Sequence, residues 1–104
     1  MSDIPRLSRA QRRILELLAA EGELHGLQLV ARSGGALKRG TIYVTLGRMQ
    51  EKGYLESRQE PLPAGAIGLP RRLYRPTGYG LKVLDAWHAA GRAFAAPPAR
   101  PEQA

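Results

Sequence analysis

The sequence predicts a mainly α fold with one small β-hairpin, an α+β architecture built in a single chain of 104 residues. Apolar residues recur every three or four positions in four segments, which is the period of an amphipathic helix. Two short segments alternate apolar and polar residues, as half-buried strands do. A hydrophobic content of 43% is that of a globular protein, so we expect the apolar faces of these segments to pack together into one core.

The first helix begins after Ser8. The stretch S-R-A-Q at residues 8–11 has the form of a capping box, in which the Ser8 and Gln11 side chains satisfy each other's free backbone amides. Gly22 ends the helix. The apolar stripe of this helix consists of Ala10, Ile14, Leu17 and Leu18.

A second, short helix is expected over about residues 26–33, after the extended link of residues 24–26, with His25 as its cap. The sequence S-G-G at 33–35 then breaks the helix, because two glycines permit a tight change of direction. The residues of this helix that we expect to be buried are Leu27, Leu29 and Val30.

The third helix is expected over about residues 39–53 and stops at Gly53. Ile42, Leu46 and Met49 lie at i, i+4 and i+7, so they form its buried face. The opposite face is polar and basic. We expect it to consist of Lys38, Arg39, Thr41, Thr45, Arg48 and Lys52.

The two strands are expected at 54–60 and 71–75, joined by the uncharged loop PLPAGAIGLP at 61–70. Thr77 can cap a fourth helix over about residues 78–95. Three short helices, a hairpin and a final helix follow one another in the order typical of a winged helix-turn-helix. Residues 96–104 lack a helical pattern and are expected to be a disordered tail.

The net charge of +7, from 16 basic and nine acidic side chains, favours nucleic acid or an anionic surface as a partner. No acidic residue occurs between Glu23 and Glu51 or between Glu60 and Asp85. Cysteine is absent, and no metal cluster, phosphate loop or base–nucleophile pair occurs, so we expect neither an enzyme nor a cofactor. No apolar run long enough for a membrane span or signal core occurs, which predicts a cytoplasmic protein without a membrane partner.

Four stretches of the sequence form a recognisable set: L-H-G at 24–26, R-G-T-I-Y-V-T-L-G-R-M at 39–49, K-G-Y-L-E-S-R at 52–58 and R-R-L-Y-R-P-T-G-Y-G at 71–80. Together these motifs resemble those of the PadR family of bacterial transcriptional regulators. The resemblance runs from about residue 14 to about residue 87, and it departs from the family at Val44, where proline is usual. Only one helix is expected after the hairpin, and in this respect the chain is similar to the short subfamily of PadR regulators.

The resemblance implies a homodimeric, sequence-specific regulator of transcription, with repression favoured, that binds double-stranded DNA at a palindromic operator. Residues 1–77 would be the winged helix-turn-helix DNA-binding domain, and residues 78–95 the dimerisation helix. The third helix would enter the major groove, and the hairpin, or wing, would lie against the DNA backbone. Fold alone does not determine function, so a winged helix used as a protein-interaction or assembly module without its own operator is the alternative.

On this basis Lys38, Arg39 and Thr41 are placed to read bases, and Thr45 to touch a thymine methyl. Arg48 and Lys52 would reach phosphates. The Tyr43 ring either packs on the second helix or sends its hydroxyl to a phosphate, and its amphipathic side chain allows both. The arginines that flank the wing loop and are expected beside the DNA backbone are Arg58, Arg71 and Arg72.

Trp87, the only tryptophan, allows two interpretations. It packs in the core or at a dimer interface, or it stacks on a flat aromatic effector, as in some members of the resembled family. The sequence therefore leaves open whether the protein binds a small-molecule effector. The expected dimer interface on the fourth helix consists of Leu81, Leu84, Trp87, His88, Gly91 and Phe94.

Overall fold

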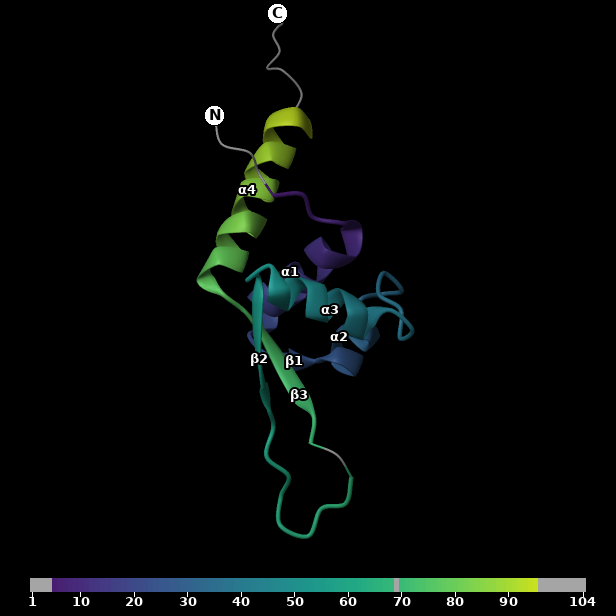
Figure 1. The fold of residues 1–104 in the computed structure, drawn as a ribbon. Helices are drawn as coiled ribbons and strands as arrows, with labels where there is room; N and C mark the ends of the chain where they lie inside the picture. The colour runs from purple at the N-terminus through teal and green to yellow at the C-terminus, as the bar shows by residue number, and fades with distance from the viewer. Residues whose placement is uncertain (1–4, 69, 96–104) are drawn as a thin grey trace, which may run out of the picture.

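The computed structural model describes residues 5–68 and 70–95, with side chains described as far as Arg92. Within them the chain forms four helices and a three-stranded antiparallel sheet (Figure 1), which confirms the predicted α+β winged helix-turn-helix. The elements in chain order are α1 (Arg9–Glu21), β1 (Leu24–His25), α2 (Gly26–Arg32), α3 (Ile42–Glu51), β2 (Leu55–Gln59), β3 (Arg72–Pro76) and α4 (Gly78–Ala95).

The ends of α1 form as the sequence predicts. The Ser8 hydroxyl accepts a hydrogen bond from the Gln11 backbone amide at 3.1 Å, and the Gln11 side-chain oxygen accepts one from the Ser8 amide at 3.0 Å. At the other end Gly22 has a φ of 92°, and its amide donates to the Leu18 carbonyl at 2.7 Å. Both ends therefore satisfy backbone groups that a helix leaves unpaired.

The sheet contains a strand that the sequence pattern does not reveal. We expected residues 24–26 to be an extended link, whereas Leu24 and His25 form β1 and pair with β3. Strand β3 thus lies in the centre, with β1 on one side and β2 on the other. Two residues are too few to show an alternating pattern, and their partners lie about fifty positions along the chain, opposite Tyr74 and Leu73.

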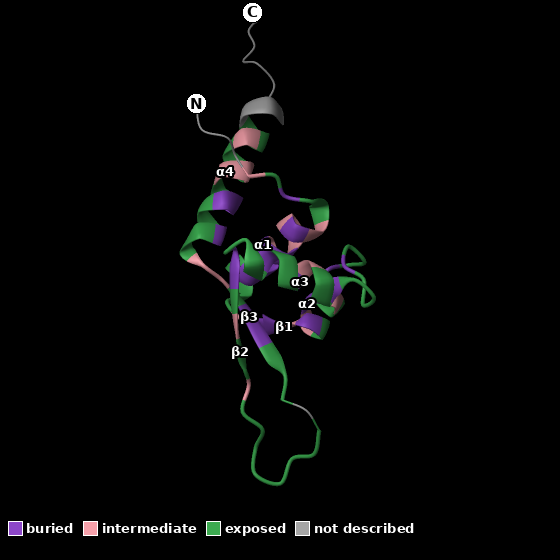
Figure 2. Cartoon of the chain, viewed as in Figure 1, coloured by how far each residue is buried: buried purple, intermediate pink, exposed green. Residues whose placement is uncertain are grey.

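The core lies between the helices and the sheet (Figure 2), while residues 61–68, 70 and 71 of the loop between β2 and β3 are exposed. As predicted, Ile42, Leu46 and Met49 of α3 are fully buried. Leu27 was expected to be buried but is 43% exposed, because it faces away from the core at the start of α2. The other fully buried large side chains are Ile14, Leu15, Leu18 and Leu29.

Helix α3 begins three residues later than predicted. Lys38 to Thr41 form a turn in which the Lys38 carbonyl accepts from the amides of Thr41, at 3.2 Å, and Ile42, at 3.0 Å. Lys38 and Arg39 therefore lie before the helix and not on it. The helix ends at Glu51, and Gly53 follows with a φ of 82°, which agrees with its predicted role as the stop.

Helix α4 begins against the segment that precedes β2. The Thr77 hydroxyl accepts from the Gly80 amide at 2.9 Å, as expected of a cap, and donates to the Gly53 carbonyl at 2.6 Å. Gly80 lies so close to Tyr54 that a Cβ at Gly80 would overlap the Tyr54 carbonyl oxygen. The first half of α4 packs on the core through Val83 and Leu84, and its second half projects away from the rest of the fold (Figure 1).

Candidate nucleic-acid interface

The outward face of α3 is centred on a residue that sequence reasoning missed. Since Ile42, Leu46 and Met49 point into the core, the helical period places Val44 on the opposite side. Val44 is 57% exposed. The helical period of the sequence is sufficient to place Val44 there, although a valine carries neither the charge nor the hydroxyl group that marks a DNA-contacting side chain. The remaining exposed residues of α3 are Tyr43, Gly47, Arg48, Gln50 and Glu51.

Thr45 lies on the flank of this face. It is half-buried, and its hydroxyl donates to the Thr41 carbonyl at 3.1 Å, one turn earlier. A threonine hydroxyl that bonds back to its own helix is not free to donate that hydrogen to a ligand. The hydrogen bond engages the Thr45 hydroxyl and not its γ-methyl group, so the contact of Thr45 with a thymine methyl stays a prediction.

The turn before α3 adds positive charge beside the start of the helix. Lys38, Arg39 and Thr41 are all exposed there. Among the residues that the structure describes, no carboxylate lies within ion-pair distance of either basic side chain. This turn therefore presents two unneutralised cations at the N-terminal end of the helix, the end that carries the positive pole of the helix dipole.

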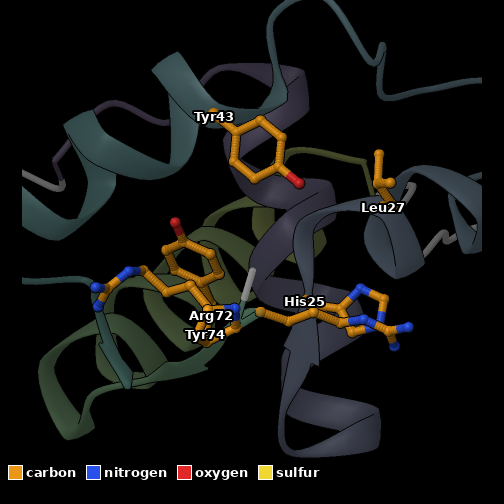
Figure 3. A pocket seen from close by; sticks show the side chains of 7 residues that line it. His25, Leu27, Tyr43, Arg72 and Tyr74 are labelled. Atoms are coloured by element: carbon orange, nitrogen blue, oxygen red, sulfur yellow. The ribbon is translucent and has the colours of Figure 1, made fainter. Parts of the chain in front are cut away.

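A hollow of about 510 Å³ connects the first turn of α3 with the start of β3, where the wing loop ends (Figure 3). The Tyr43 ring lies over Gly26 at the start of α2, where an added Cβ would stand 2.6 Å from Cε1 and 2.9 Å from the hydroxyl oxygen. The interpretation that packs Tyr43 on the second helix is thus confirmed. The hollow is lined by His25, Leu27, Tyr43, Pro70, Arg71, Arg72 and Tyr74.

The two arginines of this hollow are held by neutral partners. Arg71 Nη1 lies 3.2 Å from His25 Nε2, and because a guanidinium only donates, the imidazole accepts. Arg72 Nη1 donates to the Ser57 hydroxyl at 3.1 Å. Burial raises the pKa of the Tyr74 phenol, although the nearby charge of Arg72 acts in the opposite direction. The hollow is therefore cationic, with the Tyr74 phenol protonated at neutral pH.

Arg58 differs from the other predicted basic residues because it has a carboxylate partner. Its Nε and Nη2 donate to the two oxygens of Glu23 at 3.0 and 2.9 Å. This hydrogen bonding holds the pKa of the Glu23 carboxyl below its usual range and raises the pKa of Arg58. The pair joins β2 to the segment before β1, so Arg58 has a structural partner that sequence reasoning did not foresee.

Lys52 does not line the hollow beside Tyr43. It is the residue that follows α3, and it lines another depression together with Arg6 and Trp87. Arg48 is exposed on α3 and, within the described part of the chain, has no carboxylate partner. The structure thus joins Arg71, Arg72 and Tyr43 in one place but not Lys52.

The residues expected at a dimer interface, as far as their side chains are described, do not share one exposed stripe of α4. Leu84 is only 4% exposed because it packs into the core of its own chain, so the expectation that it faces a partner is wrong. Trp87 packs against the same core, and its indole Nε1 donates to the Pro5 carbonyl at 2.6 Å. Leu81 and Gly91 are exposed, while the Phe94 side chain lies outside the described residues.

His88, the last of the six, is exposed and lies 3.2 Å from the Glu16 carboxylate of α1.

Across the described residues no helix is both long and apolar enough to cross a membrane. No group of three potential metal ligands is found in the same part of the chain.

Comparisons with known proteins agree with this architecture. Transcriptional regulator Rv3488 of Mycobacterium tuberculosis is 38% identical over 69 residues, which cover 64% of this chain and 61% of that protein. The chain is therefore matched over less than two thirds of that relative's length.

Solved structures show the same fold. A PadR family transcription regulator from Clostridium difficile R20291 matches with a TM-score of 0.69 at 23% identity, over 85% of this chain and 92% of that one. The PcaV transcriptional regulator from Streptomyces coelicolor, solved in complex with its natural ligand, matches with a TM-score of 0.66 at 29% identity. That match covers 89% of this chain and 64% of PcaV.

The sequence profile of the transcriptional regulator PadR-like family matches residues 14–86, which is most of the chain. This family consists of transcription regulators and not of enzymes, in agreement with the expectation from the sequence. The chain belongs to the PadR-like family of transcriptional regulators.

Proposed function

We propose that the chain is a sequence-specific DNA-binding regulator, a repressor that acts as a homodimer on a palindromic operator in double-stranded DNA. One observation carries the proposal. Of the seven basic residues that the sequence assigns to the interface, Arg58 alone has a described carboxylate partner. Within the described part of the chain, the six without a carboxylate partner are Lys38, Arg39, Arg48, Lys52, Arg71 and Arg72.

In this proposal α3 lies in the major groove with its N-terminal end toward the bases. Helix-turn-helix proteins read bases mainly with that end of the recognition helix. Lys38, Arg39 and Thr41 precede or begin the helix and are exposed. A basic side chain there can donate to the major-groove edge of guanine, while Arg48 further along reaches a phosphate.

The hollow beside Tyr43 would hold a phosphate of the DNA backbone. Arg71 and Arg72 supply charged donors to it, and the Tyr43 hydroxyl lies at its edge. Their present partners are a neutral imidazole and a hydroxyl, which an anion can displace at less electrostatic cost than a carboxylate. This arrangement would secure the wing against the backbone while α3 occupies the groove.

Operator binding by charge variants tests the proposal. Arg39→Ala and Arg72→Ala should each weaken binding to DNA selected from a random pool. Removing a phosphate contact should also reduce the slope of log affinity against log salt by about 0.9 per contact. Arg75→Ala is the matched control, because Arg75 lies on the same strand as Arg72 but is paired with Glu56 at 3.0 Å.

If Arg39→Ala and Arg72→Ala bind like the parent at every salt concentration, the proposed surface is wrong. If the parent retains no DNA at physiological salt and instead recovers a stoichiometric protein partner, the chain is an interaction module.

A second experiment tests the dimer. Gly91→Glu places a charge at an exposed position of α4, and light scattering should then report the mass of a single chain. An unchanged dimer mass would exclude this part of α4 from the interface.

A small-molecule effector is a further part of the proposal, motivated by the structural match to PcaV, which was solved with its natural ligand. Depressions on both sides of Trp87 are lined by Arg6 and Lys52 on one side and by His88 and Gly91 on the other. Quenching of Trp87 fluorescence by flat aromatic acids would support a ligand there. A screen in which none of them changes either the fluorescence or operator affinity would reject it.

A further inference from the structure

Val44 occupies the centre of the α3 surface that faces outward. A single exposed valine is ordinary in a folded protein, so the meaning of Val44 depends on its surroundings. It lies opposite the three buried residues of α3 and three positions after Thr41, the last residue of the basic turn that begins at Lys38. If α3 enters the major groove, the residue on the middle of its outward face is the one that approaches the floor of the groove.

Gly47, one turn further along the same face, makes this approach closer. A Cβ at Gly47 would meet no atom of the described chain within 4 Å, so internal packing does not require a glycine there. Glycine inside a helix is less stable than alanine. The missing side chain leaves a low surface beside Val44 that a base edge can fill.

The surroundings also define the chemistry of the partner. Arg48, at i+4 from Val44, is an exposed cation suited to a phosphate beside the groove, and the exposed Arg39 in the preceding turn is suited to the edge of a base. The first acidic residue on this face is Glu51, about two turns beyond Val44. Among major-groove base edges, the C5-methyl group of thymine is the apolar group that an apolar side chain can contact.

We propose that Val44 contacts the C5-methyl group of one thymine in each half-site and thereby helps determine the operator sequence. This inference rests on the proposed function. Valine suits the role because its branched Cβ restricts χ1, so its two methyl groups are presented in a defined position. Burying one additional methyl-sized group changes affinity by about fourfold, and by about fifteenfold when both half-sites contribute.

The test removes only the methyl group. DNA that binds the full chain is selected from a random pool, and each thymine of the selected half-site is replaced in turn by deoxyuridine. We expect one position per half-site at which the parent loses about fourfold in affinity. With Val44→Ala the same replacement should have no effect, and a second selection should no longer enrich thymine there. Since Val44 is exposed and alanine favours helix, this variant should fold.

Thr45→Ala is the matched comparison, because the sequence suggested Thr45 as the residue that touches a thymine methyl. This variant should keep the deoxyuridine penalty. If Thr45→Ala abolishes the penalty, if Val44→Ala retains it, or if no position shows one, the assignment to Val44 is overturned while DNA binding stands. If the selection enriches no sequence at all, the proposed function fails as well.

Discussion

Gly80→Ala tests whether the close approach of α4 to Tyr54 is a fixed part of the fold. A Cβ at Gly80 would overlap the Tyr54 carbonyl oxygen and stand 3.0 Å from the carbonyl carbon and 3.1 Å from Cα. These are backbone atoms, and the same carbonyl accepts the Thr77 amide at 3.0 Å. A side-chain rotation cannot relieve the overlap, so α4 or the start of β2 must move.

The expected magnitude follows from two opposing terms. Overpacking a well-filled site lowers the free energy of unfolding by about 1–3 kcal/mol. Alanine in place of glycine in a helix raises it by up to about 1 kcal/mol, and by less near a helix start such as Gly80. We therefore expect a net loss of about 1–2 kcal/mol, which for a chain of this size lowers Tm by roughly 5–15 °C.

Urea and thermal unfolding of the full chain at one fixed protein concentration measure this loss, since dimerisation would make Tm depend on concentration. Gly78→Ala is the control on the same helix, because a Cβ at Gly78 meets no described atom within 4 Å and Gly78 is not among the residues expected at the dimer interface. It should leave stability unchanged or raise it slightly. If the Gly80→Ala variant unfolds at the same urea concentration as the parent, or at a higher one, the steric argument is refuted.

Three further predictions concern contacts between or within elements. Because Arg58 lowers the pKa of Glu23 in the folded chain, the unfolded chain binds more protons near and below pH 4.5. The pair's stabilisation is thus present above that range and lost on acidification, and in urea titrations at several pH values Arg58→Ala should flatten this dependence. Ser8→Ala removes a cap and should lower the free energy of unfolding by about 1 kcal/mol in a denaturant titration, with no change counting against the capping box. Trp87→Phe removes the indole bond to the Pro5 carbonyl and should lower stability by about 1 kcal/mol in thermal unfolding, whereas a more stable variant would contradict the role of that bond.

The parts of the fold that local sequence determines were predicted well. The capping box of residues 8–11, the glycine ends of α1 and α3, and the buried side of α3 each depend on residues within about two helical turns of one another. Such interactions leave a periodic or short-range pattern that can be read without knowing the fold. The PadR-like motifs then connected these elements into the winged helix-turn-helix that the structure confirms.

The sequence predicted which residue types make up the candidate DNA-binding surface, but not how the fold arranges them. Arg58, Arg71 and Arg72 have the same chemistry, yet the fold brings Glu23 to Arg58 from 35 residues away and leaves the other two with neutral partners. Leu84 and Leu81 follow the same helical spacing, but only Leu84 faces the core. A one-dimensional pattern cannot separate such residues, because their difference comes from a distant segment.

The sequence by itself therefore determined the order of elements, the helix ends, the inward side of α3 and the family of the chain. Only the tertiary structure decided that β1 joins the sheet, that Lys38 and Arg39 lie before α3, and that Arg71 and Arg72 beside the wing loop share a hollow with Tyr43. The physical reason is the range of the interactions. Caps and amphipathic periodicity act between neighbours along the chain, whereas strand pairing, ion pairs and hollows depend on segments that only folding brings together.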